Sequence, residues 1–394
     1  MISKTMKEIV ANSSAIRAMF EEGQRLALIH GAGRVYDFSL GNPNVAPPEA
    51  IRRAIINIAE SEDPVFLHGY MANAGYPDTR RAVAESINRR YATNFGEDNI
   101  IMTVGAAGAI NIALKTLLDP GDEVIVFAPF FGEYRWYVRN FGGELVIVPN
   151  ASEDFQPDLN GLERVLSPRT RAVIINSPNN PSGAVYSEET LKALAGILED
   201  WQKKTGNAVY LISDEPYREI VYDGAIIPYV TKYYKNTFVA YSYSKALSLP
   251  GERIGYLAVP PEMDGYAEIW PALAAANRIL GFVNSPSLFQ RVAAVCADAV
   301  VDTSVYAENR DILYNSLVDM GYDCFKPQGA FYLFPKTPIP DDAAFCEAAK
   351  QYRLLIVAGR AFGVPGHFRA AFCVKRETVL NSLESFKAAI GQYR

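Results

Sequence analysis

Short apolar runs rich in β-branched residues recur along the middle of the chain, and segments of helical periodicity separate several of them. The runs are 123–128, 171–176, 208–213, 237–241 and 255–259. The segment 188–198 repeats its apolar residues at the spacing of a helix. Continuous apolar strands that alternate with helices are typical of a mostly parallel sheet covered on both faces. We therefore expect an α/β protein whose ligand site lies outside the carboxyl ends of the strands.

Four of the predicted strands are followed by residues able to form a binding site. Phe131 and Asn180 come after the first two strands, Asp214 directly follows the third and Lys245 follows the fourth. Taken alone, an Asn-Pro loop is usually a turn, and an Asp after a strand is often a helix cap. Because parallel strands end at one edge of a sheet, the four residues together predict a single cleft.

Lys245 has neighbours that suit a carbonyl cofactor. It lies three residues after Ser242, and Arg253 follows eight positions later. Such a lysine could form a Schiff base with a cofactor whose phosphate is held by Ser242 and Arg253. Small residues around Gly105, at the start of a predicted helix, would add backbone N–H groups and the positive end of the helix dipole. Each feature alone also fits a surface lysine or close packing, but together they predict a dianion site beside an amine.

Composition excludes several other classes of protein. The chain has 394 residues, which suggests about two to three domains, and its 49% hydrophobic and 21% charged residues indicate a globular protein. A net charge of -6 argues against a general surface for nucleic acid or anionic membranes. The 4 cysteines lack Cys-x-x-Cys spacing and there are only 3 histidines, so we expect neither a metal site nor a disulfide framework. Without a long apolar stretch or a signal-peptide pattern, the expected location is cytoplasmic.

The motifs and their order resemble those of the pyridoxal-phosphate-dependent aminotransferases of fold type I, classes I and II, the group of the aspartate aminotransferases. The central motifs are Gly105-Ala106-Ala107, Asn180-Pro181-Ser182-Gly183, Asp214-x-x-Tyr217, Ser242-x-x-Lys245 and Arg253. Further matches run from Ser39 to Phe372. The resemblance implies pyridoxal 5′-phosphate as the cofactor. It also implies a large domain with a mostly parallel sheet at 47–302 and a smaller α/β domain formed by 1–46 and 303–394.

The resemblance assigns roles around the cofactor ring. Lys245 would hold the cofactor as a Schiff base and then shuttle a proton, for which burial and nearby positive charge must lower its pKa. Asp214 would pair with the ring nitrogen and keep it protonated. Asn180 and Tyr217 would donate hydrogen bonds to the phenolate oxygen of the ring.

Further roles concern the phosphate and the ring face. For the phosphate, the resemblance implies Gly105, Ala106, Ala107, Ser242 and Arg253. Tyr70 would reach the phosphate from a neighbouring subunit, so that the site requires a homodimer. Phe131 would stack on the ring, with Phe130 as the alternative.

The resemblance assigns some of the contacts to the substrate. Arg369 would bind the α-carboxylate as a bidentate fork, with Gly41 and Asn180 beside the substrate. Some aspartate-using members carry a lysine where this chain has Ala107, so a preference for dicarboxylates has no support there. Arg278 could meet a side-chain carboxylate from the partner subunit, but it also fits an exposed helix position.

The resemblance leads to an enzyme that moves the amino group of an L-amino acid to a 2-oxo acid by a ping-pong mechanism. A carbon–sulfur β-lyase of the cystathionine type is an alternative, because it would need Lys245, Asp214 and Arg369 as well. A regulatory protein that binds the cofactor without catalysis is a remote alternative. Such proteins place a DNA-binding domain before this fold, and we expect the first forty or so residues to be too few for one.

Overall fold

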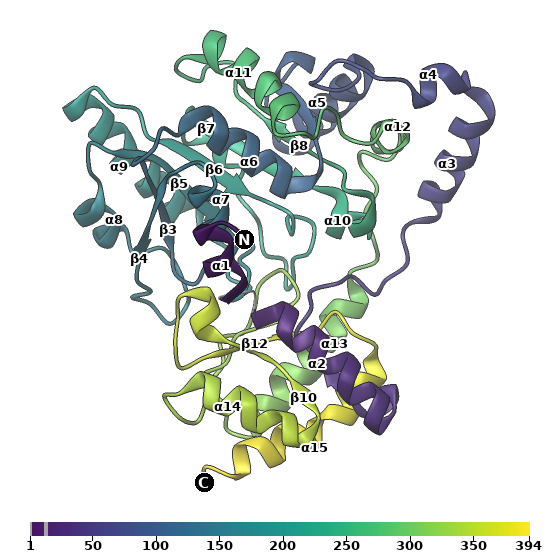
Figure 1. Cartoon of the computed structure of the whole chain (residues 1–394), viewed down its shortest axis with the longest axis vertical. Coiled ribbons are helices and arrows are strands. Elements are labelled where there is room, and N and C mark those ends of the chain that lie inside the picture. The colour runs from purple at the N-terminus through teal and green to yellow at the C-terminus, as the bar shows by residue number, and fades with distance from the viewer. Residues whose placement is uncertain (1, 12–14) are drawn as a thin grey trace.

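The computed structural model describes residues 2–11 and 15–394, and its larger part is built around a seven-stranded sheet (Figure 1). The strand order is β2-β8-β7-β6-β5-β3-β4. β8 pairs antiparallel with both of its neighbours, and every other pair in the sheet is parallel. The strands are β2 (Ile100–Thr103), β3 (Glu123–Phe127), β4 (Glu144–Val148), β5 (Thr170–Asn176), β6 (Tyr210–Asp214), β7 (Thr237–Ser242) and β8 (Gly255–Ala258). The expected α/β fold with a mostly parallel sheet is therefore confirmed.

Helices cover both faces of this sheet. One face packs against α6 (Gly105–Leu117), α7 (Tyr134–Arg139) and α11 (Tyr266–Ile279). The other face packs against α5 (Pro77–Tyr91), α8 (Leu159–Val165) and α9 (Glu188–Thr205), and α12 (Ser287–Val295) and α3 (Glu49–Ser61) pack beyond α5 in the same core. In β3, Val124 and Val126 belong to the first core, whereas Ile125 and Phe127 belong to the second. Because successive side chains of a strand point to opposite faces, a sheet buried on both sides needs the continuous apolar runs of the sequence.

The smaller part combines segments from both ends of the chain (Figure 1). Its strands are β1 (Tyr36–Asp37), β9 (Tyr332–Leu333), β10 (Leu354–Leu355), β11 (Val357–Ala358) and β12 (Phe368–Ala371). β1 pairs parallel with β10, and β11, β12 and β9 form an antiparallel sheet. The helices are α13 (Ser304–Asp319), α14 (Asp342–Ala349) and α15 (Arg376–Gly391).

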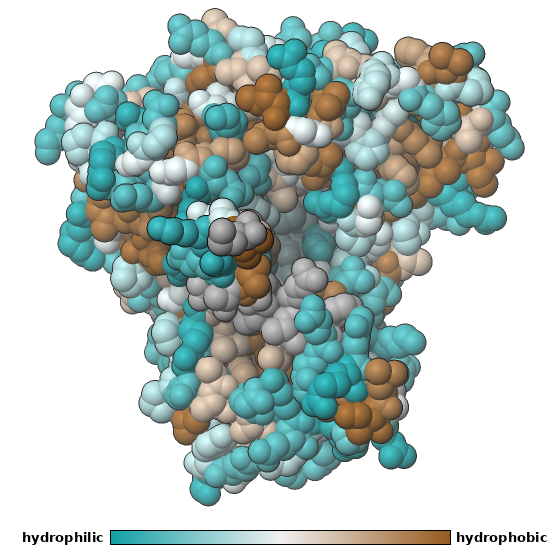
Figure 2. Space-filling model, viewed as in Figure 1, coloured by the Kyte–Doolittle hydropathy of each residue, from teal (hydrophilic) through white to brown (hydrophobic). Residues whose placement is uncertain are grey.

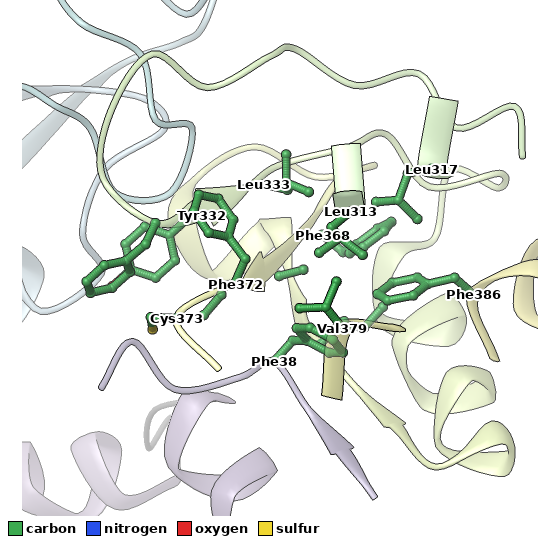
Figure 3. Close-up of a cluster of buried hydrophobic side chains, with 14 of the residues drawn as sticks. Phe38, Leu313, Leu317, Tyr332, Leu333, Phe368, Phe372, Cys373, Val379 and Phe386 are labelled. Atoms are coloured by element: carbon green, nitrogen blue, oxygen red, sulfur yellow. The ribbon is translucent and has the colours of Figure 1, made fainter. Parts of the chain in front are cut away.

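A single apolar core holds the smaller part together. Phe38, from the amino-terminal segment, packs there with Leu313, Phe368 and Phe386 (Figure 3). The Phe38 carbonyl also accepts a hydrogen bond of 2.8 Å from the Ala371 amide. The amino-terminal segment is thus attached to the carboxy-terminal part, although the division at 47–302 stays a prediction.

The remaining helices are short or lie at the edges. They are α1 (Lys4–Ala11), α2 (Ala15–His30), α4 (Pro64–His68) and α10 (Tyr243–Ala246), with 3-10 helices η1 (Ala32–Arg34), η2 (Glu97–Asn99), η3 (Val230–Lys232), η4 (Pro250–Glu252), η5 (Lys350–Tyr352) and η6 (Gly359–Phe362). In the part of the chain that the structure describes, no helix has both the length and the apolar character needed to cross a membrane.

Candidate active site

A cavity of about 350 Å³ lies between the two parts of the molecule, beyond the carboxyl ends of β5, β6 and β7. The residues that line it and that the sequence predicted are Gly41, Ala106, Ala107, Phe131, Asn180, Asp214, Tyr217, Ser242, Lys245, Arg253 and Arg369. Gly41 and Arg369 come from the smaller part, and the other predicted residues come from the larger part or the loops at its sheet edge. Residues more than 300 positions apart in the sequence therefore meet in one cavity.

Lys245 is positioned by the short helix α10, which starts directly after β7. Its Nζ donates a hydrogen bond of 2.7 Å to the Gly41 carbonyl and lies 5.4 Å from the centre of the Phe331 ring. Burial, together with the positive charges of Arg253 and Arg369, lowers the pKa of Lys245 to about 8. An amine with this pKa supplies the neutral, nucleophilic form much more readily near neutral pH than an ordinary lysine does.

Asp214 is the last residue of β6, and it is buried. One carboxylate oxygen, Oδ2, accepts a hydrogen bond of 2.5 Å from the Tyr134 hydroxyl, whereas Oδ1 has no partner among the residues that the structure describes. Burial raises the pKa of Asp214 to about 7, opposed by the Tyr134 hydrogen bond and assisted by the negative charge of Glu215. A buried carboxylate oxygen without a donor is costly, so this oxygen suits a ligand that brings an N–H group.

Hydrogen bonds of Asn176 hold the neighbouring strand ends in register. Its side-chain amide donates to the Asp214 carbonyl at 2.8 Å, and its Oδ1 accepts from the Asn180 amide at 2.7 Å. Farther along the cavity wall, the hydroxyls of Tyr217 and Tyr332 are 2.8 Å apart. These contacts join Asn180 to the ends of β5 and β6, and they join Tyr217 to Tyr332 on the cavity wall.

The start of α6 forms a cradle together with Ser242 and Arg253. Gly105 has a φ of +75°, and a Cβ added there would lie 2.7 Å from Arg253 Nη2 and 3.4 Å from Ser242 Oγ. Arg253 donates to the carbonyls of Val104 and Pro250, at 3.2 and 3.0 Å. No carboxylate of the described residues lies within ion-pair distance of Arg253. Backbone amides at a helix start and an unpaired guanidinium form a site that suits a phosphate.

Arg369 lies in β12 and is among the most deeply buried large side chains of the chain. Its two terminal nitrogens donate to Asn180 Oδ1 at 3.0 Å and to the Ser39 carbonyl at 2.5 Å, whereas Nε has no acceptor. The rings of Tyr332 and Phe362 flank the guanidinium at 4.6 and 4.8 Å. Within 2–11 and 15–394 no carboxylate pairs with it, so a bound anion would stabilise this buried cation.

The remaining predicted residues differ in whether they line the cavity. Phe131 lines the cavity, whereas Phe130 is packed in the core beside α6, so only the first is available to a ligand. Gly105 lies next to the cavity through its contact with Arg253. Tyr70 is 93% exposed and lies outside the cavity of its own chain, and Arg278 is exposed near the end of α11.

Several cavity residues were not predicted as site residues. They are Leu40, Ile110, Glu133, Tyr137, Asn176, Pro216, Ser244, Pro250 and Tyr332. Tyr134, the partner of Asp214, was missed as well. Asn176 could have been found as the polar last residue of a buried strand. No local signal marks Tyr134, because its role depends on a contact with a residue 80 positions away. Within the described part of the chain, no group of three or more metal-ligating side chains gathers.

The relatives found by comparison with known proteins are named as aminotransferases. The family model of aminotransferase class I and II matches residues 34–386. An aspartate/prephenate aminotransferase of Thermus thermophilus is 31% identical over 358 residues, which are 89% of this chain and 90% of the relative. A Bacillus subtilis protein named "Probable N-acetyl-LL-diaminopimelate aminotransferase" is 30% identical, over 89% of this chain and 88% of the relative.

The solved structures that resemble this chain also include aminotransferases. The crystal structure of an amino transferase from Eubacterium rectale has a TM-score of 0.97 and 48% identity, and the match covers 100% of this chain and 99% of that chain. The family model covers most of the chain, and its members use pyridoxal 5′-phosphate. The buried Asp214 oxygen, the cradle at Gly105 and the unpaired guanidiniums all fit that cofactor and its substrates. This chain therefore belongs to the class I and II aminotransferases and is a pyridoxal-phosphate-dependent aminotransferase.

Proposed function

We propose that the enzyme moves the amino group of an L-amino acid to a 2-oxo acid by a ping-pong mechanism, in the cavity around Lys245. The observation that carries this proposal is the set of charges without partners in one cavity. Asp214 has a buried oxygen without a donor, Arg253 and Arg369 have no carboxylate partner among the described residues, and Lys245 has a lowered pKa. A phosphorylated pyridine aldehyde and an amino-acid carboxylate would satisfy each of these groups.

Residues of this chain would hold the cofactor at four places. Asp214 Oδ1 would accept a hydrogen bond from the ring nitrogen, and Phe131 would cover one face of the ring. The Asn180 side-chain nitrogen and the Tyr217 hydroxyl would donate to the phenolic oxygen. The cradle formed by Ser242, Arg253 and the backbone of Gly105, Ala106 and Ala107 would hold the phosphate.

Lys245 and Arg369 act on the substrate. Bound pyridoxal phosphate supplies a carbonyl carbon and an electron-withdrawing ring, which make the α-proton of an amino acid labile. The Lys245 amine would hold the cofactor and, when free, would accept the α-proton of the substrate and give it back. Arg369 binds the α-carboxylate, with Asn180 and the Gly41 segment beside it, and so presents the α-carbon to the Lys245 amine.

A second copy of the chain would complete the site. Tyr70 and the neighbouring apolar side chains Val65 and Phe66 are 93, 81 and 57% exposed, and hydrophobic residues gather over α3 and α4 (Figure 2). An exposed apolar surface of this kind favours an interface. We infer a homodimer in which Tyr70 reaches the phosphate of the neighbouring subunit. The division at 47–302 and the cytoplasmic location remain predictions.

A spectroscopic screen tests the function. The purified holoenzyme is mixed with each of the twenty amino acids, and the visible absorbance of the bound cofactor is followed. We expect at least one amino acid to convert the cofactor to its amine form, and a 2-oxo acid to reverse the change. Lys245→Ala should lose both the visible absorbance and multiple turnover. Release of pyruvate, ammonia and a thiol from cystathionine, without any need for an oxo acid, would instead indicate a lyase.

A further inference from the structure

Five charged side chains line the active-site cavity, and four of them have a role in the proposed function. Asp214, Lys245, Arg253 and Arg369 serve the ring, the aldehyde, the phosphate and the α-carboxylate. The fifth, Glu133, has no such counterpart. Among the groups of an amino-acid substrate, only the side chain has no assigned contact in the cavity. The side chain is also the group that differs from one amino acid to another.

Glu133 lies directly before α7 and is half-buried. Among the described residues, its carboxylate forms no hydrogen bond and no ion pair. The nearby cation Arg135 instead places its guanidinium 5.0 Å from the centre of the Phe130 ring. Partial burial raises the pKa of Glu133, because it disfavours the charged form of the carboxylate.

The charge of Glu133 reaches the interior of the cavity. The pKa of Tyr137, whose ring lines the same cavity, is raised first by burial and then by the negative charge of Glu133. On the cavity wall, Ala107 and Ile110 are small or apolar and offer no cation that could neutralise it. Glu133 therefore contributes a negative charge to this part of the cavity wall, where the positive charge of Arg253 acts on Tyr137 in the opposite direction.

Glu133 also borders a second, larger cavity. This adjoining space has a volume of about 970 Å³, and Phe131 and Glu133 line both cavities. Trp136, Leu145 and Phe362 provide apolar walls to the larger cavity. A long side chain that leaves the α-carbon could place its methylene groups against these walls and its end group near Glu133.

We propose that Glu133 is a specificity-determining residue that favours substrates with a cationic side chain over substrates with a side-chain carboxylate. This inference rests on the proposed function. A half-buried carboxylate without a partner is stabilised by an ammonium or guanidinium group, and it repels a second carboxylate. The preferred substrates are thus basic amino acids, with ornithine as a probe whose length is close to that of glutamate.

The test compares ornithine, glutamine and glutamate in the half-reaction that converts the cofactor to its amine form. In the wild-type holoenzyme we expect kcat/KM to decrease in that order. Glu133→Gln should lower kcat/KM for ornithine about tenfold, raise it for glutamate and leave it nearly unchanged for glutamine. Glu189→Gln, which removes an exposed carboxylate on α9, is the control for the change in net charge.

Binding without turnover gives an independent readout. The α-methyl derivatives of ornithine and glutamate lack the α-proton, so calorimetry with them reports binding alone. Glu133→Gln should weaken binding of the first and strengthen binding of the second. If the cofactor is converted but Glu133→Gln leaves kcat/KM unchanged for both ornithine and glutamate, the inference about Glu133 is wrong. If no amino acid converts the cofactor, the proposed function itself is wrong.

Discussion

At the scale of residues, burial sets the chemistry of the site. The same loss of water lowers the pKa of Lys245 to about 8 and raises that of Asp214 to about 7. The directions are opposite because burial disfavours the charged form, which is the protonated form of a lysine and the deprotonated form of an aspartate. Without the cofactor, burial therefore favours the uncharged form of both side chains. A ligand with groups of complementary charge would favour their charged forms.

The raised pKa of Asp214 predicts how the stability of the cofactor-free protein depends on pH. Between about pH 4 and pH 7 the folded protein keeps a proton that the unfolded chain loses, so the free energy of unfolding falls as the pH rises. Asp214→Asn removes this contribution. Urea unfolding at pH 5 and pH 8 should show that the variant gains stability relative to the wild type between the two pH values, by up to about 3 kcal/mol.

Asp154→Asn provides the control for this measurement, because it removes an exposed carboxylate from a loop. Its free energy of unfolding should follow that of the wild type at both pH values. An Asp214→Asn variant that also follows the wild type would mean that Asp214 is ionised in the folded protein at pH 5.

At the scale of elements, the site depends on how closely α6 approaches β8. Gly105 begins α6 with a positive φ, and a Cβ added at Gly255 in β8 would lie 2.9 Å from the Gly105 Cα. The two glycines allow the loop before α6, β8 and the Arg253 side chain to meet without side chains between them. Backbone amides at the helix start are thereby left open to a phosphate.

We predict that Gly105→Ala weakens cofactor binding more than it affects the fold. The added methyl group would lie 2.7 Å from Arg253 Nη2, and alanine costs about 1 kcal/mol more than glycine at this positive φ. Titration of the cofactor-free protein with pyridoxal phosphate should show a dissociation constant raised about tenfold or more.

Gly196→Ala is the matched control, since a Cβ at this position in α9 would have nothing within 4 Å. It should leave the dissociation constant unchanged and raise the free energy of unfolding by about 0.5–1 kcal/mol. Equal effects of the two substitutions on cofactor binding would contradict the role of the Gly105 cradle.

At the scale of the whole molecule, the two parts of the chain form the site jointly. Arg369 and Gly41 belong to the smaller part, and they contact Asn180 and Lys245 at the edge of the large sheet. A relative movement of the two parts would therefore change the position of the α-carboxylate site with respect to the lysine. In the proposed homodimer Tyr70 would extend this dependence to a second chain, because it is exposed and lies away from its own cavity.

Hybrid dimers test whether Tyr70 acts across an interface. Tyr70→Ala and Lys245→Ala should each be impaired alone. After mixing under conditions that exchange subunits, a hybrid has one site with both an intact Lys245 and an intact Tyr70 from the other chain. Activity should then recover to roughly one quarter of the wild-type rate. No recovery in a confirmed hybrid would place Tyr70 in its own active site or outside both sites.

Local sequence patterns were sufficient for the fold class and for several residues of the cavity. Strands buried on both faces need continuous apolar residues, and their polar ends reach one edge of the sheet, so Asn180, Asp214 and Lys245 could be placed together. The family motifs added Arg369 and Gly41. The spacing of apolar residues alone would not have placed these two residues at the edge of the sheet.

The sequence alone thus determined the elements, their order and the residues at the sheet edge, because these depend on neighbours within a few positions. Only the tertiary structure decided which groups lack partners. The free Oδ1 of Asp214, the unpaired guanidinium of Arg369 and the uncompensated Glu133 result from contacts between segments far apart in the chain. Burial and hydrogen bonding set their charge and reactivity, and both are properties of the packed molecule rather than of any local segment.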